Sequence, residues 1–152
     1  MKTFESLDAL VAAKGEVLGT SSWVEITQEA VNLFADATGD HQWIHVDVEK
    51  AKSGPFGGTI AHGFMTLSLI PRLMHEMYTV GGIKLAINYG LNKVRFPSPV
   101  PVGSKVRATS TLVDAEDVGN DTVQLTVSTV IEIEGGGKPA CVAESVLRYI
   151  GG

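Results

Sequence analysis

The stretch from Gly39 to His45 holds side chains that can move protons. It reads GDHQWIH and contains one acid, Asp40, and a histidine five residues later, His45. A carboxylate beside an imidazole can fix its tautomer, an arrangement that suits general acid–base catalysis worth about 10²–10⁴ in rate. On an ideal helix the two side chains would point about 140° apart, so they meet only if the chain turns sharply between them. Gly39 favours such a turn.

Each residue of this pair also has a structural interpretation when it is taken alone. Asp40 could be a solvated residue at the exit of a helix, and His45 could be a half-buried histidine bonded to a main-chain carbonyl. Both lie next to the large apolar residues Trp43 and Ile44. A polar pair is costly to bury in such surroundings unless it has partners or a role, which favours proton transfer.

A metal site is the other alternative for this stretch. His41 and His45 are four residues apart, a spacing that places two ligands on one helical face, and Asp40 and Asp47 could add oxygens. However, the segment after Gly39 is not expected to be a regular helix, and the sequence has neither an HExxH pattern nor a cysteine ligand nearby. We therefore expect no metal.

A second candidate feature is AHGFMT, residues 61–66, which opens an apolar run directly after the flexible loop SGPFGG (53–58). Helix N-termini present unpaired N–H groups, and a glycine there lets a carbonyl approach the main chain closely. Gly63 is thus a candidate oxyanion donor, although it could equally be a packing glycine. His62 could be a capping or core histidine, and we expect it to contact substrate rather than to act as a catalyst.

Helices must position these residues. Apolar spacing predicts a short helix over 4–13, and Thr27 is the expected N-cap of a second helix that ends at Gly39. The apolar run 61–79 predicts a central helix with neighbours on several sides. Pro71 should kink or break it, because proline lacks an N–H donor.

The second half of the chain has the period of strands. A first strand is predicted over 16–26, and alternation of apolar and polar residues predicts further strands over 83–96, 104–112, 122–134 and 139–150, with turns near Asn120 and 135–137. One polar face indicates an antiparallel sheet. The α+β arrangement that buries both apolar surfaces is a sheet curled around the central helix. Open sheet edges favour pairing with a second copy.

Composition limits the class of protein. The 152 residues, 44% hydrophobic and 19% charged, predict one domain over 1–152. A net charge of −5 argues against a broad surface for nucleic acid or anionic membrane. The single Cys141 excludes an internal disulfide and fits a reducing cytosol. No signal peptide is expected, and no stretch approaches the roughly 18 apolar residues of a membrane span, so we expect a cytoplasmic protein.

Long stretches resemble the hydratase 2 signature of the MaoC-like family, the (R)-specific enoyl-CoA hydratases. They are FADATGDHQWIHVD (34–47) and GPFGGTIAHGFMTLSLIP (54–71), and NYGLNKVRFPSPVPVGSKV (88–106) resembles the strand and turn that follow. The nodulation-protein-N-like branch is most similar, over nearly the whole chain. Many members read D-x-N-P-x-H, whereas Gln42 and Trp43 stand at the Asn-Pro positions here. A helix serine of some relatives is Pro71 here, so these contacts do not transfer.

The resemblance implies a hot-dog fold, in which an antiparallel sheet wraps a long central helix and dimerises through the sheet. It implies reversible syn hydration of trans-2-enoyl-CoA to (R)-3-hydroxyacyl-CoA in fatty acid metabolism. Asp40 and His45 would hold the water and share the proton transfers, and the Gly63 N–H would stabilise the enolate oxygen. No metal or redox cofactor is expected, since coenzyme A enters only as part of the substrate.

Further residues would contact an acyl-CoA substrate. Phe64 could line an apolar tunnel for the acyl chain, Arg95 is one of several cations that could meet coenzyme A phosphates, and polar groups of the next strand could support the site. The predicted substrate-binding residues are His62, Phe64, Asn88, Tyr89, Asn92 and Arg95.

Two alternatives remain beside the hydratase. A hot-dog thioesterase would commonly place a carboxylate on or beside the central helix, where this chain has only Glu76, near the far end. A non-catalytic acyl-CoA-binding protein is the other, because a fold does not determine an activity.

Overall fold

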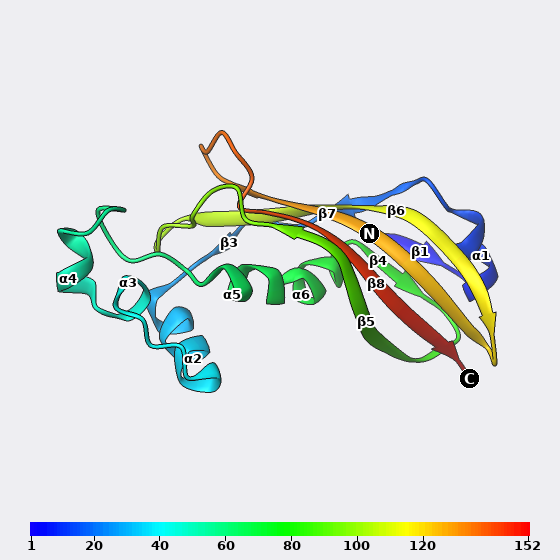
Figure 1. Ribbon diagram of the computed structural model, residues 1–152. Coiled ribbons are helices and arrows are strands. Elements are labelled where there is room, and N and C mark those ends of the chain that lie inside the picture. The colour runs from blue at the N-terminus through cyan, green and yellow to red at the C-terminus, as the bar shows by residue number, and fades with distance from the viewer.

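A curved antiparallel sheet forms the body of the molecule (Figure 1). The computed structural model describes residues 1–152. Its strands follow the order β2-β6-β7-β8-β5, and β3 also pairs with β6. The strands are β2 (Val17–Thr20), β3 (Val24–Glu25), β5 (Ile83–Arg95), β6 (Lys105–Gly119), β7 (Thr122–Ile133) and β8 (Cys141–Gly151). The antiparallel sheet predicted from the period of two is confirmed.

The concave face of this sheet is the core side. Along β6 every second residue is buried from Val106 to Leu112, and β7 alternates in the same way. Two polar residues interrupt the apolar face at paired positions, Ser110 and Thr129, and their hydroxyls are hydrogen-bonded at 2.7 Å. Because each hydroxyl has the other as its partner, the sheet buries them without an unpaired group.

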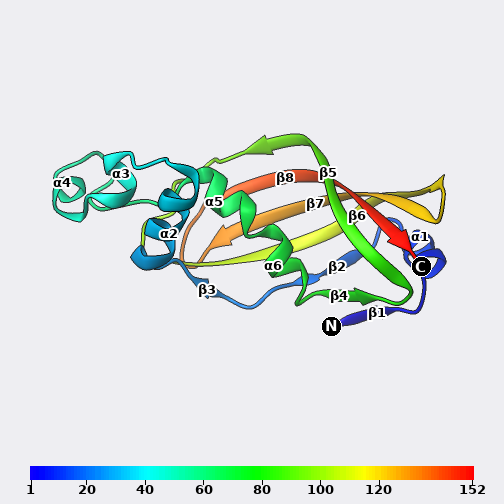
Figure 2. The same cartoon turned by 90° about the horizontal axis from the view of Figure 1, so that it is seen from below.

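The central helix crosses the concave face in two segments, α5 (Gly63–Ser68) and α6 (Ile70–Met74) (Figure 2). The predicted break is present. It falls at Leu69, so that Pro71 lies in the first turn of α6, where its missing N–H removes no helical hydrogen bond. The helix stops at Met74, short of residue 79, because β4 (Tyr78–Val80) pairs in parallel with β1 (Lys2–Phe4).

Three short helices gather at one end of the sheet, beyond the start of α5: α2 (Gln28–Thr38), α3 (Trp43–Val46) and α4 (Val48–Lys52) (Figures 1 and 2). Thr27 caps α2, since its hydroxyl accepts a hydrogen bond from the Ala30 N–H at 3.1 Å. Gly39 ends α2 with a φ of 79°, the left-handed conformation that glycine adopts freely. Both predicted ends of α2 are confirmed.

The opposite end of the sheet carries both termini and α1 (Leu7–Ala12) (Figure 1). Helix α1 begins three residues later than predicted, because Lys2–Phe4 forms β1. No helix of the structure is both long and apolar enough to cross a membrane.

Strand β5 forms one edge of the sheet and bonds only to β8. Only Ile83 and Val94, at or next to its ends, are partly covered, while the residues between them are exposed on both faces. These exposed side chains include the large apolar residues Leu85, Ile87, Tyr89 and Leu91. The edge is therefore unusually apolar for a strand in contact with water.

Candidate active site

A pocket of about 500 Å³ lies where the α2–α4 end of the molecule meets the start of α5. Asp40, His45 and Gly63, the three residues predicted to be catalytic, all line it, as do His62 and Phe64. The remaining lining residues, which the sequence reasoning did not assign to the site, are Phe34, Thr38 and Phe96.

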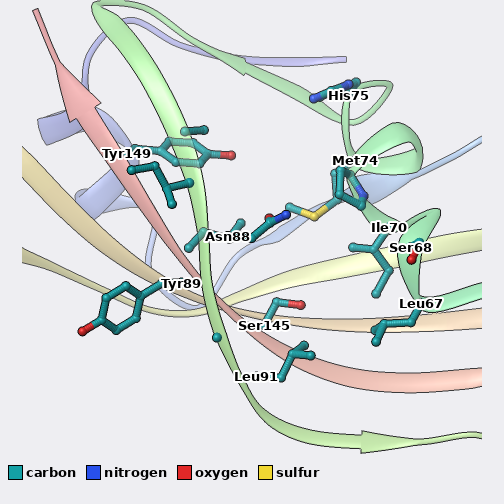
Figure 3. A pocket seen from close by; sticks show the side chains of 15 residues that line it. Leu67, Ser68, Ile70, Met74, His75, Asn88, Tyr89, Leu91, Ser145 and Tyr149 are labelled. Atoms are coloured by element: carbon teal, nitrogen blue, oxygen red, sulfur yellow. The ribbon is translucent and has the colours of Figure 1, made fainter. Parts of the chain in front are cut away.

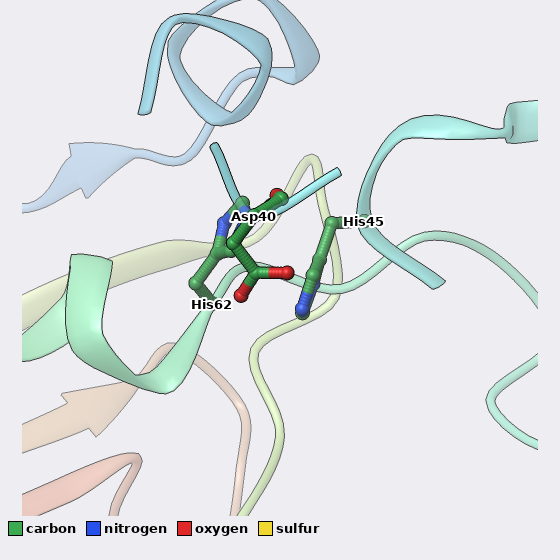
Figure 4. A group of neighbouring side chains, drawn as sticks. All are labelled: Asp40, His45 and His62. Carbon is green, nitrogen blue, oxygen red and sulfur yellow. The ribbon is translucent and has the colours of Figure 1, made fainter. Parts of the chain in front are cut away.

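Asp40 and His45 are brought together by the turn that follows Gly39. After the left-handed glycine, the Gln42 N–H points to the Asp40 carboxylate at 3.4 Å, and α3 then carries His45 back toward it. Figure 4 shows the Asp40 carboxylate directed toward the two imidazoles, and one polar atom each of Asp40, His45 and His62 lie within 4.8 Å of one another. Asp40 is exposed, whereas His45 is only 6% exposed.

The His45 ring has one nitrogen engaged and one free. Its Nδ1 donates to the Ile60 carbonyl at 2.7 Å, because a carbonyl oxygen can only accept. Nε2 has no hydrogen-bond partner within the chain, and the residue lines the pocket. Behind the ring, the Gln28 amide donates to the His45 carbonyl at 2.8 Å and accepts from the Thr59 hydroxyl at 2.6 Å. The sequence offered no signal for Gln28 or Thr59, which lie far from His45 along the chain.

His62 is 3% exposed and lies against both members of the pair. Its Nε2 donates to the Asp40 main-chain carbonyl at 2.9 Å. Its ring stacks on His45 with 3.8 Å between centroids and 24° between planes. Its Nδ1 is buried and has no hydrogen-bond partner.

Gly63 is the first residue of α5, and its N–H donates to no atom of the chain. A side chain at this position would crowd Phe96, because a Cβ atom would lie 3.0 Å from Cδ2 of its ring and the ring would have to shift. Gly63 therefore packs against Phe96 and, in the lining of the pocket, keeps a main-chain N–H without a partner.

Two groups of residues near the pocket could be considered for a metal ion, the predicted pair His41 and His45 and the observed group Asp40, His45 and His62. His41 lies outside the pocket and pairs with Asp36 at 2.9 Å, and this hydrogen bond raises the pKa of His41. It does not join His45. The group Asp40, His45 and His62 is compact enough for an ion. However, His45 Nδ1 and His62 Nε2 are already bonded to main-chain carbonyls, so only one nitrogen of each ring could bind an ion.

The other predicted substrate-binding residues lie outside this pocket. Asn88 and Tyr89 line a second cavity of about 540 Å³ between the central helix and β5, and the Tyr89 ring points away from the helix toward Arg148 (Figure 3). Asn92 donates to Glu144 at 2.9 Å, and Arg95 donates to the Val94 carbonyl at 2.7 Å. Phe96 lines the pocket but the neighbouring Arg95 does not, because successive side chains of an extended chain alternate in direction.

Comparisons with known proteins agree with this architecture. Residues 10–134 match the family described as the MaoC like domain. The chain is 74% identical over 150 residues to 3-hydroxyacyl-thioester dehydratase Z of Mycobacterium tuberculosis (strain CDC 1551 / Oshkosh), covering 99% of each chain. It is 44% identical over 131 residues to nodulation protein N of Rhizobium leguminosarum bv. viciae, covering 85% of this chain and 81% of that protein.

The fold is also shared with a solved structure, an (R)-hydratase from A. caviae involved in PHA biosynthesis. The TM-score is 0.72 at 25% identity, covering 88% of this chain and 94% of the other. The predicted hot-dog fold is thereby confirmed. The chain belongs to the MaoC-like dehydratase family.

Proposed function

We propose that the chain is a hydro-lyase that interconverts a trans-2-enoyl thioester and a (R)-3-hydroxyacyl thioester, with coenzyme A as the thiol. The observation that carries this proposal is the convergence of Asp40, His45 and the free Gly63 N–H on one pocket. The names of the relatives support it, one as a 3-hydroxyacyl-thioester dehydratase and one as an (R)-hydratase.

In the hydration direction, one water molecule is held between the Asp40 carboxylate and His45 Nε2. The pair removes a proton from this water as its oxygen bonds to C3. The electrons of the C2–C3 double bond then move to the thioester oxygen, where the Gly63 N–H stabilises the negative charge. A proton passes from the pair to C2 and restores the carbonyl. The step adds one water in total, and the reverse sequence is dehydration.

The acyl chain is proposed to follow α5 from the first pocket to the second cavity. Phe64 lines the first and Leu67, one helical turn later, lines the second. In Figure 3 the side chains of Leu67 and Ile70 face those of Ser145 and Leu91 across this cavity. Nine of its fifteen lining residues are hydrophobic, as an alkyl chain requires.

A hot-dog thioesterase would commonly place a carboxylate on or beside the central helix, aimed at the substrate carbonyl, and Glu76 is the only candidate near this helix. Glu76 is not in either cavity. Its carboxylate instead accepts hydrogen bonds from the Ser22 N–H and hydroxyl at 2.7 and 3.0 Å. This engagement favours hydration over hydrolysis.

The direct test is the loss of enoyl-thioester absorbance when a trans-2-enoyl-CoA is mixed with enzyme. Asp40→Asn and His45→Gln should each lower kcat by about 10²–10⁴, the range for removal of a general acid–base group. His41→Gln is the matched control, because His41 pairs with Asp36 outside the pocket. Normal turnover by Asp40→Asn or His45→Gln, with folding verified by circular dichroism, would refute the assignment.

The same mixtures separate the hydratase from its rivals. We expect no release of free thiol above the uncatalysed rate, while the product is the (R)-3-hydroxyacyl thioester over a limited range of chain lengths. Thiol release without loss of the double bond would identify a thioesterase. Saturable binding with no reaction at any chain length would identify a binding protein.

A further inference from the structure

His62 is the residue through which all three parts of the pocket are connected. Its Nε2–H holds the Asp40 carbonyl, its ring lies against the His45 ring, and its main chain continues directly into the Gly63 N–H. The carboxylate, the imidazole and the oxyanion donor therefore depend on the place of one side chain. Among the residues that line the pocket, only His62 has both a hydrogen bond to Asp40 and a ring contact with His45.

The unpaired nitrogen of His62 is not explained by packing. A buried polar atom without a partner lowers stability, so a ring needed only to fill space would be better supplied by phenylalanine. Phe34 also packs against His62, with 4.9 Å between ring centroids, and an apolar ring would suit these surroundings. A histidine that keeps Nδ1 unpaired thus indicates that Nε2–H, the other nitrogen, is needed.

We propose that His62 is a positioning residue, whose Nε2–H bond to the Asp40 carbonyl sets the Asp40 carboxylate opposite His45. This inference rests on the proposed function. His62 acts through Asp40 and His45 and transfers no proton itself. It must also be present as the Nε2–H tautomer, since the Asp40 carbonyl can only accept, whereas His45 must be the Nδ1–H tautomer because of Ile60.

Two substitutions separate the hydrogen bond from the ring. His62→Phe keeps a ring that can stack and loses the donor, whereas His62→Gln keeps an amide donor near the place of Nε2 and loses the ring. We expect His62→Phe to lower kcat about 10–100-fold with a change in KM below about threefold, because the loss concerns the reacting groups rather than binding. The kcat of His62→Gln should be at least about threefold higher than that of His62→Phe. His41→Phe serves as the control for introducing phenylalanine in this segment.

Rates are expressed per folded molecule, measured by thermal unfolding, so that loss of fold is not read as loss of positioning. A kcat of His62→Phe within twofold of wild type overturns the inference. So does His62→Gln with no more activity than His62→Phe. If His62→Phe does not fold, the kcat of His62→Gln is compared with that of His62→Ala, which lacks both the donor and the ring. We expect His62→Ala to have the lower kcat, and equal kcat values would overturn the inference.

A readout without turnover keeps this inference distinct from the proposed function. Long-range ¹H–¹⁵N spectra of the histidine rings at neutral pH should show His62 protonated at Nε2 only and His45 protonated at Nδ1. A proton on Nδ1 of His62 overturns the inference even if the enzyme is active. A wild-type enzyme that shows these tautomers but does not hydrate any enoyl thioester refutes the proposed function alone.

Discussion

At the scale of single residues, the pocket combines one exposed acid with two buried imidazoles. Each imidazole uses one nitrogen for a main-chain carbonyl, Ile60 for His45 and Asp40 for His62. Such bonds fix ring orientation, and this leaves one His45 nitrogen available to a reacting molecule. Asp40, by contrast, is exposed while it lines the same pocket.

Gly63 permits a prediction about steric fit. Gly63→Ala should lower kcat about tenfold or more, because the added Cβ lies 3.0 Å from the Phe96 ring and must displace either the ring or the Gly63 N–H. Gly58→Ala, where a Cβ meets nothing within 4 Å, is the control.

A second substitution tests the cause of that loss. Adding Phe96→Ala to Gly63→Ala removes the obstructing ring and should recover part of kcat in steady-state assays of enoyl-thioester hydration. Equal activity of Gly63→Ala and wild type would show that the N–H position is not critical.

The sequence predicted which residues form the pair but not what holds them. Asp40, His45 and Gly63 could be predicted, because their residue types and the neighbouring glycines indicate chemistry. Gln28, Thr59 and the Ile60 carbonyl were not predictable, since their hydrogen bonds join segments that lie apart in sequence. Asn92 and Arg95 looked suitable by type, but each is engaged with a neighbour on or next to β5.

At the scale of elements, Glu76 ties the chain to Ser22 two residues beyond the end of the interrupted central helix. The Ser22 N–H is the main cause of a lowered pKa of Glu76, and the Ser22 hydroxyl adds to it. A carboxyl whose pKa is lower in the folded state stabilises the fold above its unfolded pKa, near 4.5, and loses this effect as the pH falls through the folded pKa.

Glu76→Gln should therefore lower stability at pH 7 by about 1 kcal/mol, a value discounted for solvent exposure, which corresponds to a few degrees in Tm. The difference between variant and wild type should shrink by pH 3. Thermal unfolding at both pH values measures it, with the exposed Glu134→Gln as control. A difference that stays constant between pH 7 and pH 3 would exclude an effect of the Glu76 charge.

Element boundaries were predictable where a local signal marks them. Thr27 and Gly39 bound α2 because capping depends on residues within one turn. The end of α6 at Met74 was not predictable, because it depends on β4 pairing with β1, which lies more than 70 residues earlier in the sequence. Periodicity alone favours continuing the apolar helix through that point.

At the scale of the whole molecule, the exposed apolar side chains of β5 indicate an unsatisfied edge. One side of the β5 main chain has no strand to pair with, and large apolar side chains of β5 are exposed. We propose that a second copy of the chain pairs there, as sequence reasoning predicted from the open sheet edges.

Ile87→Asp should convert the protein from twice the 16.1 kDa chain mass to the mass of one chain, as light scattering after size exclusion would show. A charge at the centre of the edge would be buried without a partner in a dimer. Val130→Asp, an exposed site on β7 inside the sheet, should leave the mass unchanged. A wild-type protein that is a monomer at all concentrations would contradict this prediction.

The overall architecture was the most predictable level, because the alternation of residues from 104 to 134 specifies which face of the sheet is buried. The strand order needed the structure. A single domain over 1–152 and a cytoplasmic location stay predictions.

The central claim is that one water molecule, held between Asp40 and His45, is added from one side of the double bond. A single turnover of a trans-2-enoyl-CoA in deuterium oxide, followed by NMR of the product, tests it most directly. The account predicts an (R)-3-hydroxy product with deuterium at C2 on the same face as the new hydroxyl. Deuterium on the opposite face, or on both faces after one turnover, would contradict it.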